Sequence, residues 1–377
     1  MGTRVSVSMI GHKRFGSREG GVEVVVTELA RRMAARGMRV TCYDRSGSDV
    51  MTGEKAAVAE HVEDGVAVVP VRTIDKKGLA ALSSSFFATL RAIRERPSVI
   101  HYHAEGPCVP LCLAHWAGIR TVATIHGLDW QRAKWGRLAS AYIKLGEKMA
   151  ARYADEVIVL SRSAQEYFKS AYGRQTRLIP NGIDTKEPAG TDIITTSWGL
   201  GDGDYVLFLG RLVPEKRPEL LIKAFESLDT AKKLVIAGAA SDTSAYVQEL
   251  RDRARGDDRV VFTGFVTGEP LAQLFSHAAA YVLPSDVEGM PISLLEAMAY
   301  GRCCITSDIP ECADVLGDAG LTFKQGSEES LAAVLALALE DESRARKLGE
   351  AACLRARAEY GWDRVVDRTV ALYEGRE

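Results

Sequence analysis

The chain has 377 residues, of which 46% are hydrophobic, and a formal net charge of −2. This length predicts two domains, because a domain usually holds about 100–200 residues. The small net charge argues against a general affinity for nucleic acid, and no apolar run reaches the roughly 20 residues that a membrane-spanning helix needs.

The first half of the chain alternates short β-branched runs with longer amphipathic stretches. Helical spacing is clearest in residues 22–36, where Val25, Leu29 and Met33 recur on one face and Gly37 ends the pattern. Such alternation predicts a parallel sheet covered by helices on both faces. The strands expected here are residues 4–10, 40–44, 66–71, 99–103, 121–126 and 157–160.

A turn-rich segment, residues 180–205, has no sustained periodicity, and the alternation restarts after it. The strands expected in the second half are residues 206–209, 234–237, 260–263, 280–283, 303–306 and 321–323. We therefore predict an α/β protein of two Rossmann-like, doubly wound domains, residues 1–190 and 191–358, facing each other across a cleft. Residues 359–377 are expected to form a helix that packs back on the first domain.

The start of the chain and its cysteines both favour a cytoplasmic protein. The N-terminus begins with a strand pattern where a secretory signal peptide would lie. The seven cysteines form no Cys-x-x-Cys pair and lie mostly in apolar runs, so we expect small buried side chains in a reducing compartment. We find no cluster of His and Cys that indicates a metal site.

The first loop of chemical interest is GHKRFGSREGGVE, residues 11–23, between the first expected strand and the first long helix. Gly16, Gly20 and Gly21 allow the backbone to approach a ligand, and the helix entrance offers N–H groups to an anion. The stretch is not the Gly-x-Gly-x-x-Gly fingerprint, which argues against an NAD-linked dehydrogenase. The alternative is a mobile connection without a ligand.

The second loop is GRLVPEKRP, residues 210–218, directly after the first strand of the second domain. Arg211 and Lys216 place two cations at the carboxyl end of that strand, where a planar guanidinium and a point charge suit a diphosphate. The alternative is a solvated basic loop.

The third stretch is SDVEGMPISLLEAMAYG, residues 285–301, which begins at the end of a strand. Pro291 suits the first turn of a helix, with Ile292, Leu295 and Ala299 on its inward face. Glu288 would lie beside the helix N-terminus, and Glu296 would lie inside the helix. A buried carboxylate is costly unless it accepts hydrogen bonds, and the two hydroxyls of a ribose would donate them. The alternatives are a dipole-complementing Glu288 and a partly exposed Glu296.

The fourth candidate is His126, in TVATIHGLDW at residues 121–130. A lone histidine is more often structural than catalytic. Its place at the carboxyl end of an expected strand favours a functional role, and Glu105, which follows another strand, is a weaker candidate of the same kind.

Together these motifs resemble the retaining glycosyltransferases of family 4, which have the GT-B architecture. The resemblance covers nearly the whole chain and is most specific in GRLVPEK at residues 210–216 and PSDVEGMPISLLEA at residues 284–297. It implies that a sugar passes from a nucleoside-diphosphate sugar to the hydroxyl of a glycan, a glycolipid or a small molecule. It also implies that no metal or other cofactor is needed, because basic residues and helix amides stabilise the leaving diphosphate.

The resemblance also implies a role for each candidate. Arg211 and Lys216 would hold the diphosphate, Glu288 would contact the donor sugar, Glu296 would bind the ribose, and His126 would lie beside the reacting sugar. Further donor contacts are implied for Gly289, Met290 and Pro291, for Gly20 and Gly21 near the phosphates and the acceptor, and for Phe265 and Val266 around the base.

Residues 132–152 carry a second pattern, which suits a peripheral membrane contact or a lipid-linked acceptor. The apolar stripe comprises Trp135, Leu138, Tyr142, Leu145 and Met149, and the basic stripe comprises Lys134, Arg137, Lys144 and Lys148, with Glu147 as an isolated acid. The alternative is an ordinary amphipathic helix whose apolar stripe packs on the sheet.

The partners expected are therefore a nucleotide-sugar donor and a carbohydrate or lipid-linked acceptor, with no nucleic acid. Polysaccharide biosynthesis is a plausible setting for the family, in the cytoplasm or at the inner face of the membrane. An NDP-sugar epimerase of the same architecture and a non-catalytic nucleotide-sugar-binding protein are the alternative functions. The sugar, the base and the acceptor are not specified by the motifs.

Overall fold

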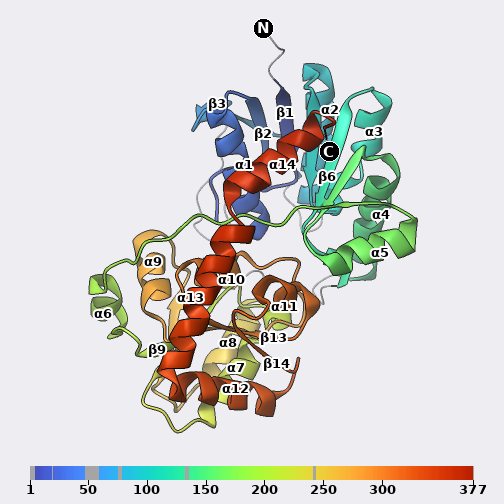
Figure 1. The fold of residues 1–377 in the computed structure, drawn as a ribbon. Coiled ribbons are helices and arrows are strands. Elements are labelled where there is room, and N and C mark those ends of the chain that lie inside the picture. The colour runs from blue at the N-terminus through green and yellow to red at the C-terminus, as the bar shows by residue number, and fades with distance from the viewer. Residues whose placement is uncertain are drawn as a thin grey trace. The chain divides into compact units, whose positions relative to one another are not determined.

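The computed structural model of the chain describes residues 5–18, 20–46, 59–74, 79–131, 136–240 and 243–376. The chain forms two units, each built on a largely parallel sheet with helices around it (Figure 1). The first unit comprises Met1–Gly182 and Trp362–Glu377, and the second comprises Ile183–Gly361.

The division of the chain differs from the predicted boundaries at 190/191 and 358/359. Ile183 N donates to Tyr360 O (2.7 Å), and Ala189 N donates to Ser276 Oγ (3.0 Å). Residues 183–190 therefore hydrogen-bond to the second unit, although their turn-rich composition suggested the end of the first. Gly182 packs against Trp362, since a Cβ at Gly182 would lie 2.3 Å from the indole ring.

The first unit has an eight-stranded sheet in the order β3-β4-β2-β1-β5-β6-β7-β8, parallel except for the β3–β4 pair. Its strands are β1 (Ser6–Ile10), β2 (Arg39–Arg45), β3 (His61–Glu63), β4 (Val66–Val71), β5 (Val99–His103), β6 (Arg120–Ile125), β7 (Glu156–Val159) and β8 (Arg177–Leu178). Its helices are α1 (Gly21–Ala35), α2 (Ala80–Glu95), η1 (Gly106–Cys108), α3 (Leu111–Trp116), η2 (Asp129–Gln131), α4 (Arg137–Tyr153), α5 (Arg162–Tyr172) and α14 (Trp362–Tyr373).

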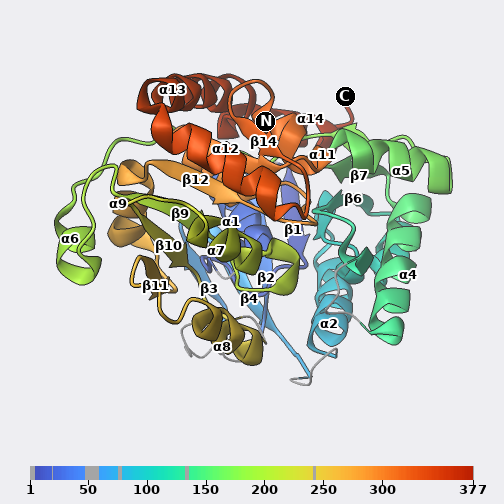
Figure 2. The ribbon, with the colours of Figure 1, turned by 90° about the horizontal axis from the view of Figure 1, so that it is seen from below.

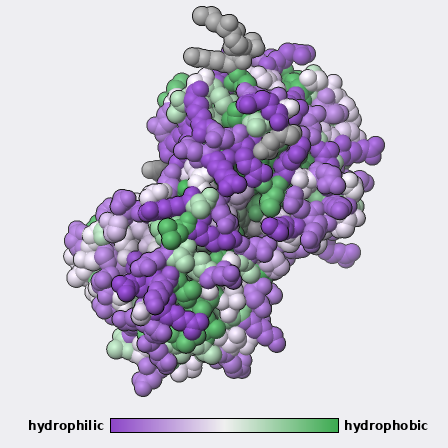
Figure 3. Space-filling model, in the orientation of Figure 1, coloured by the Kyte–Doolittle hydropathy of each residue, from purple (hydrophilic) through white to green (hydrophobic). Residues whose placement is uncertain are grey.

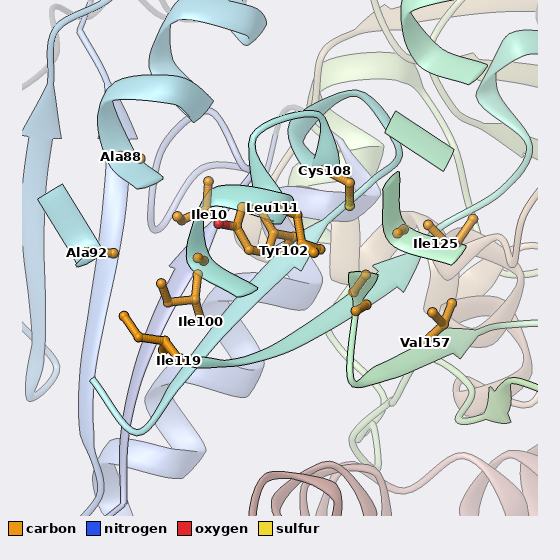
Figure 4. Close-up of a cluster of buried hydrophobic side chains, with 14 of the residues drawn as sticks. Ile10, Ala88, Ala92, Ile100, Tyr102, Cys108, Leu111, Ile119, Ile125 and Val157 are labelled. Carbon is orange, nitrogen blue, oxygen red and sulfur yellow. The ribbon is translucent and has the colours of Figure 1, made fainter. Parts of the chain in front are cut away.

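Local sequence explains where these elements begin and end. Helix α5 starts at Ser161, whose Oγ accepts from Ala164 N (3.2 Å), and ends at Gly173, which has a φ of +63°. Strand β5 is buried at every residue, as expected for a central parallel strand. Its Ile100 and Tyr102 join Ile10 of β1 and Ala88 of α2 in the core shown in Figure 4.

The second unit has a six-stranded sheet in the order β11-β10-β9-β12-β13-β14, and all its strand pairs are parallel. Its strands are β9 (Tyr205–Leu209), β10 (Lys233–Ala237), β11 (Val260–Gly264), β12 (Ala280–Leu283), β13 (Cys303–Ser307) and β14 (Leu321–Phe323). Its helices are α6 (Asp192–Trp198), η3 (Pro214–Lys216), α7 (Pro218–Glu226), α8 (Ser244–Arg253), α9 (Gly268–His277), α10 (Ile292–Ala299), α11 (Pro310–Leu316), α12 (Glu328–Glu340) and α13 (Glu342–Glu359). Helix α7 packs beside α12 (Figures 1 and 2).

Helix α14 belongs to the first unit and is fixed there at both ends. Arg36, which directly follows α1, forms ion pairs with Asp363 and Asp367 near the start of α14. Near the end of α14, the hydroxyl of Tyr373 lies 2.6 Å from Nδ1 of His101 in β5, and both residues are buried. The last segment of the chain thus contributes to the core of the first unit.

On the face shown in Figure 3, hydrophilic residues predominate and hydrophobic ones gather in small patches. In the part of the chain that the structure describes, no helix combines the length and the apolar character needed to cross a bilayer. All seven cysteines are unpaired thiols, and five of them are buried.

Candidate functional site

The strand order of the second unit indicates where a ligand would bind. Strand β9 lies between β10 and β12, so the chain moves outward from β9 in one direction and later returns to its other side. In parallel α/β sheets, ligands bind at such a switch point, outside the carboxyl ends of the strands. The loops that follow β9 and β12 border this point and carry Arg211, Lys216 and Glu288.

Lys216 and Glu288 form an enclosed ion pair at this switch point. Lys216 Nζ lies 2.6 Å from Glu288 Oε1, and the two side chains are only 12% and 8% exposed. Ser285 Oγ donates to the same carboxylate oxygen (2.7 Å). Asp286 N donates to Glu215 O (2.8 Å), which ties the loop after β12 to η3. Lys216 is therefore not part of a freely solvated basic loop, which was the alternative interpretation.

Two glycines allow the loops at this edge to approach one another. Gly238 has a φ of +146°, and a Cβ there would lie 1.8 Å from Gly210 O. A Cβ on Gly210 would lie 2.9 Å from Lys216 Cδ, so Gly210 leaves room for the lysine side chain. Gly210 N donates to Ala237 O (3.0 Å) and Gly238 N to Gly264 O (2.8 Å), which connects the ends of β9, β10 and β11. Arg211 is half-buried beside this edge.

Helix α10 places Glu296 in the interior of the second unit. Glu296 is 7% exposed, so it is not the partly exposed helix residue of the alternative interpretation. Gly289 and Met290 are buried just before the helix. A buried carboxylate next to a ligand-binding edge is suited to accept hydrogen bonds from hydroxyl groups.

Two details of α10 differ from the prediction. Pro291 occupies the N-cap position, with a ψ of 117°, rather than the first turn of the helix. The inward face is also wider than predicted, because residues 294–299 are all buried while Ile292 is only half-buried. A helix that is apolar on nearly all sides has no single inward stripe.

Phe265 and Val266 directly follow β11, an edge strand of the second sheet. Phe265 is 39% exposed and Val266 is half-buried. An exposed ring at the carboxyl end of a strand is available to a ligand, and its role around a base stays a prediction.

In the first unit, His126 is half-buried and lies next to the buried His103, which in turn lies next to the buried His101. His126 Nε2 lies 3.1 Å from His103 Nδ1, and the ring of His103 lies 4.1 Å from that of His101. His101 Nε2 is also 2.7 Å from Thr124 Oγ1. Burial lowers the pKa of His126 to about 4 and that of His101 to about 3, and it lowers the pKa of His103 well below its ordinary value. All three rings are therefore neutral at physiological pH.

The glycine-rich loop after β1 is held by buried acceptor side chains from α1 and β2. Because three of its backbone N–H groups are bound, residues 13–16 form a fixed turn, and the interpretation as a mobile connection is wrong for them. These hydrogen bonds run from Lys13 N to Glu23 Oε1 (3.1 Å), from Phe15 N to Asp44 Oδ1 (3.0 Å) and from Gly16 N to Thr27 Oγ1 (2.9 Å).

Gly20 and Gly21 lie at the start of α1, as the N-cap and the first helical residue. A Cβ on Gly20 would lie 2.7 Å from Glu23 Oε2, so the carboxylate of Glu23 already occupies the entrance of this helix. A carboxylate there complements the helix dipole but repels a phosphate. The phosphate role of the two glycines stays a prediction, and Glu23 is a residue that sequence reasoning missed.

Helix α4 presents a different face from the one expected. Leu138 is 89% exposed and Leu145 is 45% exposed, whereas Gly146 and Glu147 are buried. Leu138 and Leu145 of the apolar stripe therefore face solvent, whereas Tyr142 and Met149 of the same stripe are half-buried and the isolated acid Glu147 is fully buried. Lys134 and Trp135 lie outside the described residues, as do all of residues 132–135.

Two family models match the chain. The model described as Glycosyltransferase Family 4 matches residues 19–187, and the model described as Glycosyl transferases group 1 matches residues 193–355. Each match lies almost entirely within one of the two α/β units.

Among the described residues, no three His, Cys, Asp or Glu side chains are grouped so that they could hold a metal ion.

Named relatives and solved structures are similar over nearly the full length. D-inositol 3-phosphate glycosyltransferase of Xylanimonas cellulosilytica is 27% identical, over 94% of this chain and 91% of its own. Sucrose-phosphate synthase from Thermosynechococcus elongatus has a TM-score of 0.80 at 23% identity, over 99% of both chains. Anabaena HepE, in complex with UDP-glucose, has a TM-score of 0.79 at 18% identity, over 99% of this chain and 100% of its own. The fold is that of the GT-B glycosyltransferases.

Proposed function

Because the chain belongs to the glycosyltransferases of group 1 and family 4, we propose that it transfers a sugar from a nucleoside-diphosphate sugar with retention of configuration. A transferase forms a new glycosidic bond, so the family membership sets aside the epimerase and the non-catalytic binding protein. The acceptor is the hydroxyl of a glycan, a glycolipid or a small molecule.

The observation that carries this proposal is the Lys216–Glu288 pair at the switch point of the second sheet. In this pair, a cation suited to the diphosphate contacts an acid suited to the sugar hydroxyls. Glu296 lies buried in α10, the helix that follows. HepE, which has the same fold, is described as a complex with UDP-glucose, and this supports a nucleotide-sugar donor.

The reaction requires stabilisation of negative charge. The bond between the anomeric carbon and the diphosphate oxygen breaks, the acceptor oxygen bonds to that carbon, and the acceptor proton goes to a diphosphate oxygen. Fixed cations and helix N–H groups lower such a barrier because they need no reorganisation as charge develops. We assign this role to Arg211, Lys216 and the N-terminus of α10, and we propose transfer without a metal ion.

The first unit serves the sugar and the acceptor in this proposal. His126 is neutral, so it would give a directed hydrogen bond to a hydroxyl without attracting a second anion. The relative from Xylanimonas acts, by its name, on D-inositol 3-phosphate, which makes a small phosphorylated alcohol one acceptor to test.

Turnover of variants tests the assignment. Lys216→Ala and Arg211→Ala should each lower the turnover of a nucleotide sugar by about 10²–10³-fold, the loss typical of removing one charge-stabilising group. Lys223→Ala, which breaks the exposed Lys223–Glu328 pair in the same unit, is the matched control and should stay near the wild-type rate. Near-wild-type transfer by Lys216→Ala, with its fold intact, would contradict the proposal.

Exposed apolar and basic residues of α4 favour a peripheral membrane contact as a second property. Leu138 and Leu145 project outward, with Arg137, Lys144 and Lys148 exposed beside them. Apolar and basic side chains on one exposed helix face suit an anionic lipid surface. This contact, and a place at the inner face of the membrane, belong to the proposal.

Vesicle sedimentation tests the membrane contact. The protein should sediment with vesicles that contain anionic lipid and much less with neutral ones, and Leu138→Ser combined with Leu145→Ser should abolish the difference. Val62→Ser, at an exposed valine on another surface of the first unit, is the control. Absence of binding at low salt would remove the membrane contact from the proposal.

A further inference from the structure

Two carboxyl side chains of the first unit are fully buried and have no role in the chemistry described above. Glu105 follows β5, and Glu147 lies in α4, and both are 0% exposed. Because a buried carboxylate is strongly disfavoured without hydrogen-bond donors, their surroundings must provide them.

Glu147 is surrounded by donors. Trp130 Nε1 donates to Glu147 Oε2 (3.1 Å), and the hydroxyl of Tyr167 donates to Glu147 Oε1 (2.7 Å). The hydroxyl of Tyr172 donates to the same oxygen, Oε1. Both oxygens of Glu147 therefore accept hydrogen bonds, and all three donors come from side chains outside α4.

Glu105 is arranged differently. Its Oε2 accepts from Asp129 N (2.8 Å), whereas its Oε1 receives no hydrogen bond from any donor in the described part of the chain. The pKa of Glu105 is raised well above its ordinary value, first by burial and then by its hydrogen bond with Glu147. This shift favours the protonated form of Glu105, in which its hydroxyl donates a hydrogen bond to Glu147.

The backbone is shaped to bring these two groups together. Ala104 has a φ of +72°, a left-handed conformation that is unfavourable for alanine, and it turns the chain immediately before Glu105. Gly146, next to Glu147, lies so close that a Cβ would be 2.0 Å from Glu105 O. The left-handed Ala104 costs stability, and the close contact at Gly146 excludes any larger residue there. Both features bring the turn at Glu105 into contact with α4.

The pair holds the loop that follows His126. Asp129 N is bound by Glu105 and Trp130 Nε1 by Glu147, so residues 127–131 are fixed at two adjacent points. We propose that Glu105 and Glu147, sharing one proton, are positioning residues that hold this loop and thereby His126 in place. The functional part of this inference rests on the proposed role of His126 beside the reacting sugar.

The inference carries a pH dependence. Four titratable groups face Glu105: Glu147 of α4, Asp129 of η2, Cys108 of η1 and Tyr167 of α5. The nearby cation is Lys144, whose ammonium group lies over the ring of Trp130. The folded state holds the Glu105 proton more tightly than the unfolded chain. The contribution of this proton to stability is therefore complete at low pH and is lost as pH rises through the raised pKa of Glu105, where a buried negative charge on Glu105 would release the loop.

Two substitutions at Glu105 separate proton sharing from simple packing. A glutamine can still donate to Glu147 and accept from Asp129 N, whereas a leucine can do neither. Glu105→Leu should lower kcat about tenfold or more without changing the affinity for a nucleoside diphosphate. Glu105→Gln should keep kcat near the wild-type value and should not show the loss of kcat that we expect in wild type as pH rises through the raised pKa of Glu105. Glu95→Leu, at a carboxylate that accepts from Tyr43 elsewhere in the first unit, is the matched control.

Trp130 fluorescence reports the loop without requiring activity. The emission of Trp130, isolated by subtracting Trp130→Phe, should shift to longer wavelength and become more accessible to acrylamide in Glu105→Leu but not in Glu105→Gln. Wild-type emission and kcat in Glu105→Leu would overturn the inference, as would a Glu105→Gln variant as impaired as Glu105→Leu. If transfer itself is not observed, the proposed function fails, and the fluorescence result still decides whether the pair positions the loop.

Discussion

The two units place different electrostatics at the carboxyl ends of their sheets. In the second unit, the switch point carries an ion pair between Lys216 and Glu288, with Arg211 close by in sequence. In the first unit, the corresponding edge carries His126 and His103, whose pKa values are lowered by burial so that both rings are neutral.

This difference matches a division of labour in glycosyl transfer. A leaving diphosphate needs fixed positive charge, whereas a sugar or acceptor hydroxyl needs directed hydrogen bonds. Under the proposed function, two sheets of the same architecture would supply two kinds of chemistry through the residues at their strand ends. Substitutions can test whether the second unit stabilises the charge of the diphosphate and whether the first unit positions hydroxyl groups through neutral side chains.

The largest effect is expected for Glu288→Ala. The substitution removes the acid assigned to the donor sugar and leaves Lys216 without its ion-pair partner, so turnover should fall by about 10²–10³-fold. Steady-state kinetics with a nucleotide sugar measures this. Glu328→Ala breaks an exposed pair with Lys223 and should change turnover little. Equal effects of the two substitutions would argue against a special role for the switch point.

The next effect is on nucleotide binding. Glu296→Ala should weaken the binding of a nucleoside diphosphate by about 10–100-fold, because a hydrogen bond to a charged group contributes roughly 1.5–3 kcal/mol. Calorimetric titration measures the affinity, and the deoxyribose analogue should bind wild type and variant more equally. An unchanged affinity would count against a ribose role for Glu296.

A smaller effect is expected in the first unit. His126→Asn should lower kcat about tenfold, the loss of one neutral hydrogen bond in the transition state, while the affinity for a nucleoside diphosphate stays within about twofold. His115→Asn, at an exposed histidine of α3, is the control. A large loss of nucleotide affinity in His126→Asn would erase the proposed distinction between the units.

The last prediction concerns stability at acidic pH rather than activity. The folded-state pKa of His101 is about 3, below its ordinary value of 6.5, so folding requires the neutral ring. Its contribution is complete above pH 6.5 and is lost as pH falls toward 3, at about 1.4 kcal/mol per pH unit. Denaturant unfolding between pH 7 and 5 should show a shallower loss of stability in His101→Gln than in wild type. Parallel slopes would show that His101 is not buried as a neutral group.

Local pattern was sufficient for the central strands of both sheets and insufficient for the two edge strands of the first sheet. Strand β5 has the predicted bounds, residues 99–103, because Val99 and Ile100 begin a short run of strand-forming residues directly after the turn residues Pro97 and Ser98. Strand β3 was missed because all three of its residues are exposed, and β8 was missed because two residues show no period. Edge strands depend on a neighbouring strand more than on their own composition.

The candidate site divides in a similar way. Arg211, Lys216 and Glu288 could be found because their short motifs follow strands, and the sheet order then brings two of them into contact. Glu147 could not be interpreted from sequence, because its hydrogen-bond partners come from η2 and α5. Helix α4 buries Gly146 rather than Leu138, since only a glycine allows the close approach to Glu105, and hydrophobicity patterns do not register such contacts.

A structure of the protein with a bound nucleoside-diphosphate sugar tests the central claim most directly. We predict that the pyrophosphate lies at the carboxyl ends of β9 and β12 in the second unit, with one of its oxygens about 3 Å from Lys216 Nζ. A pyrophosphate bound instead at the strand ends of the first unit, with the Lys216–Glu288 pair untouched by ligand, would contradict it.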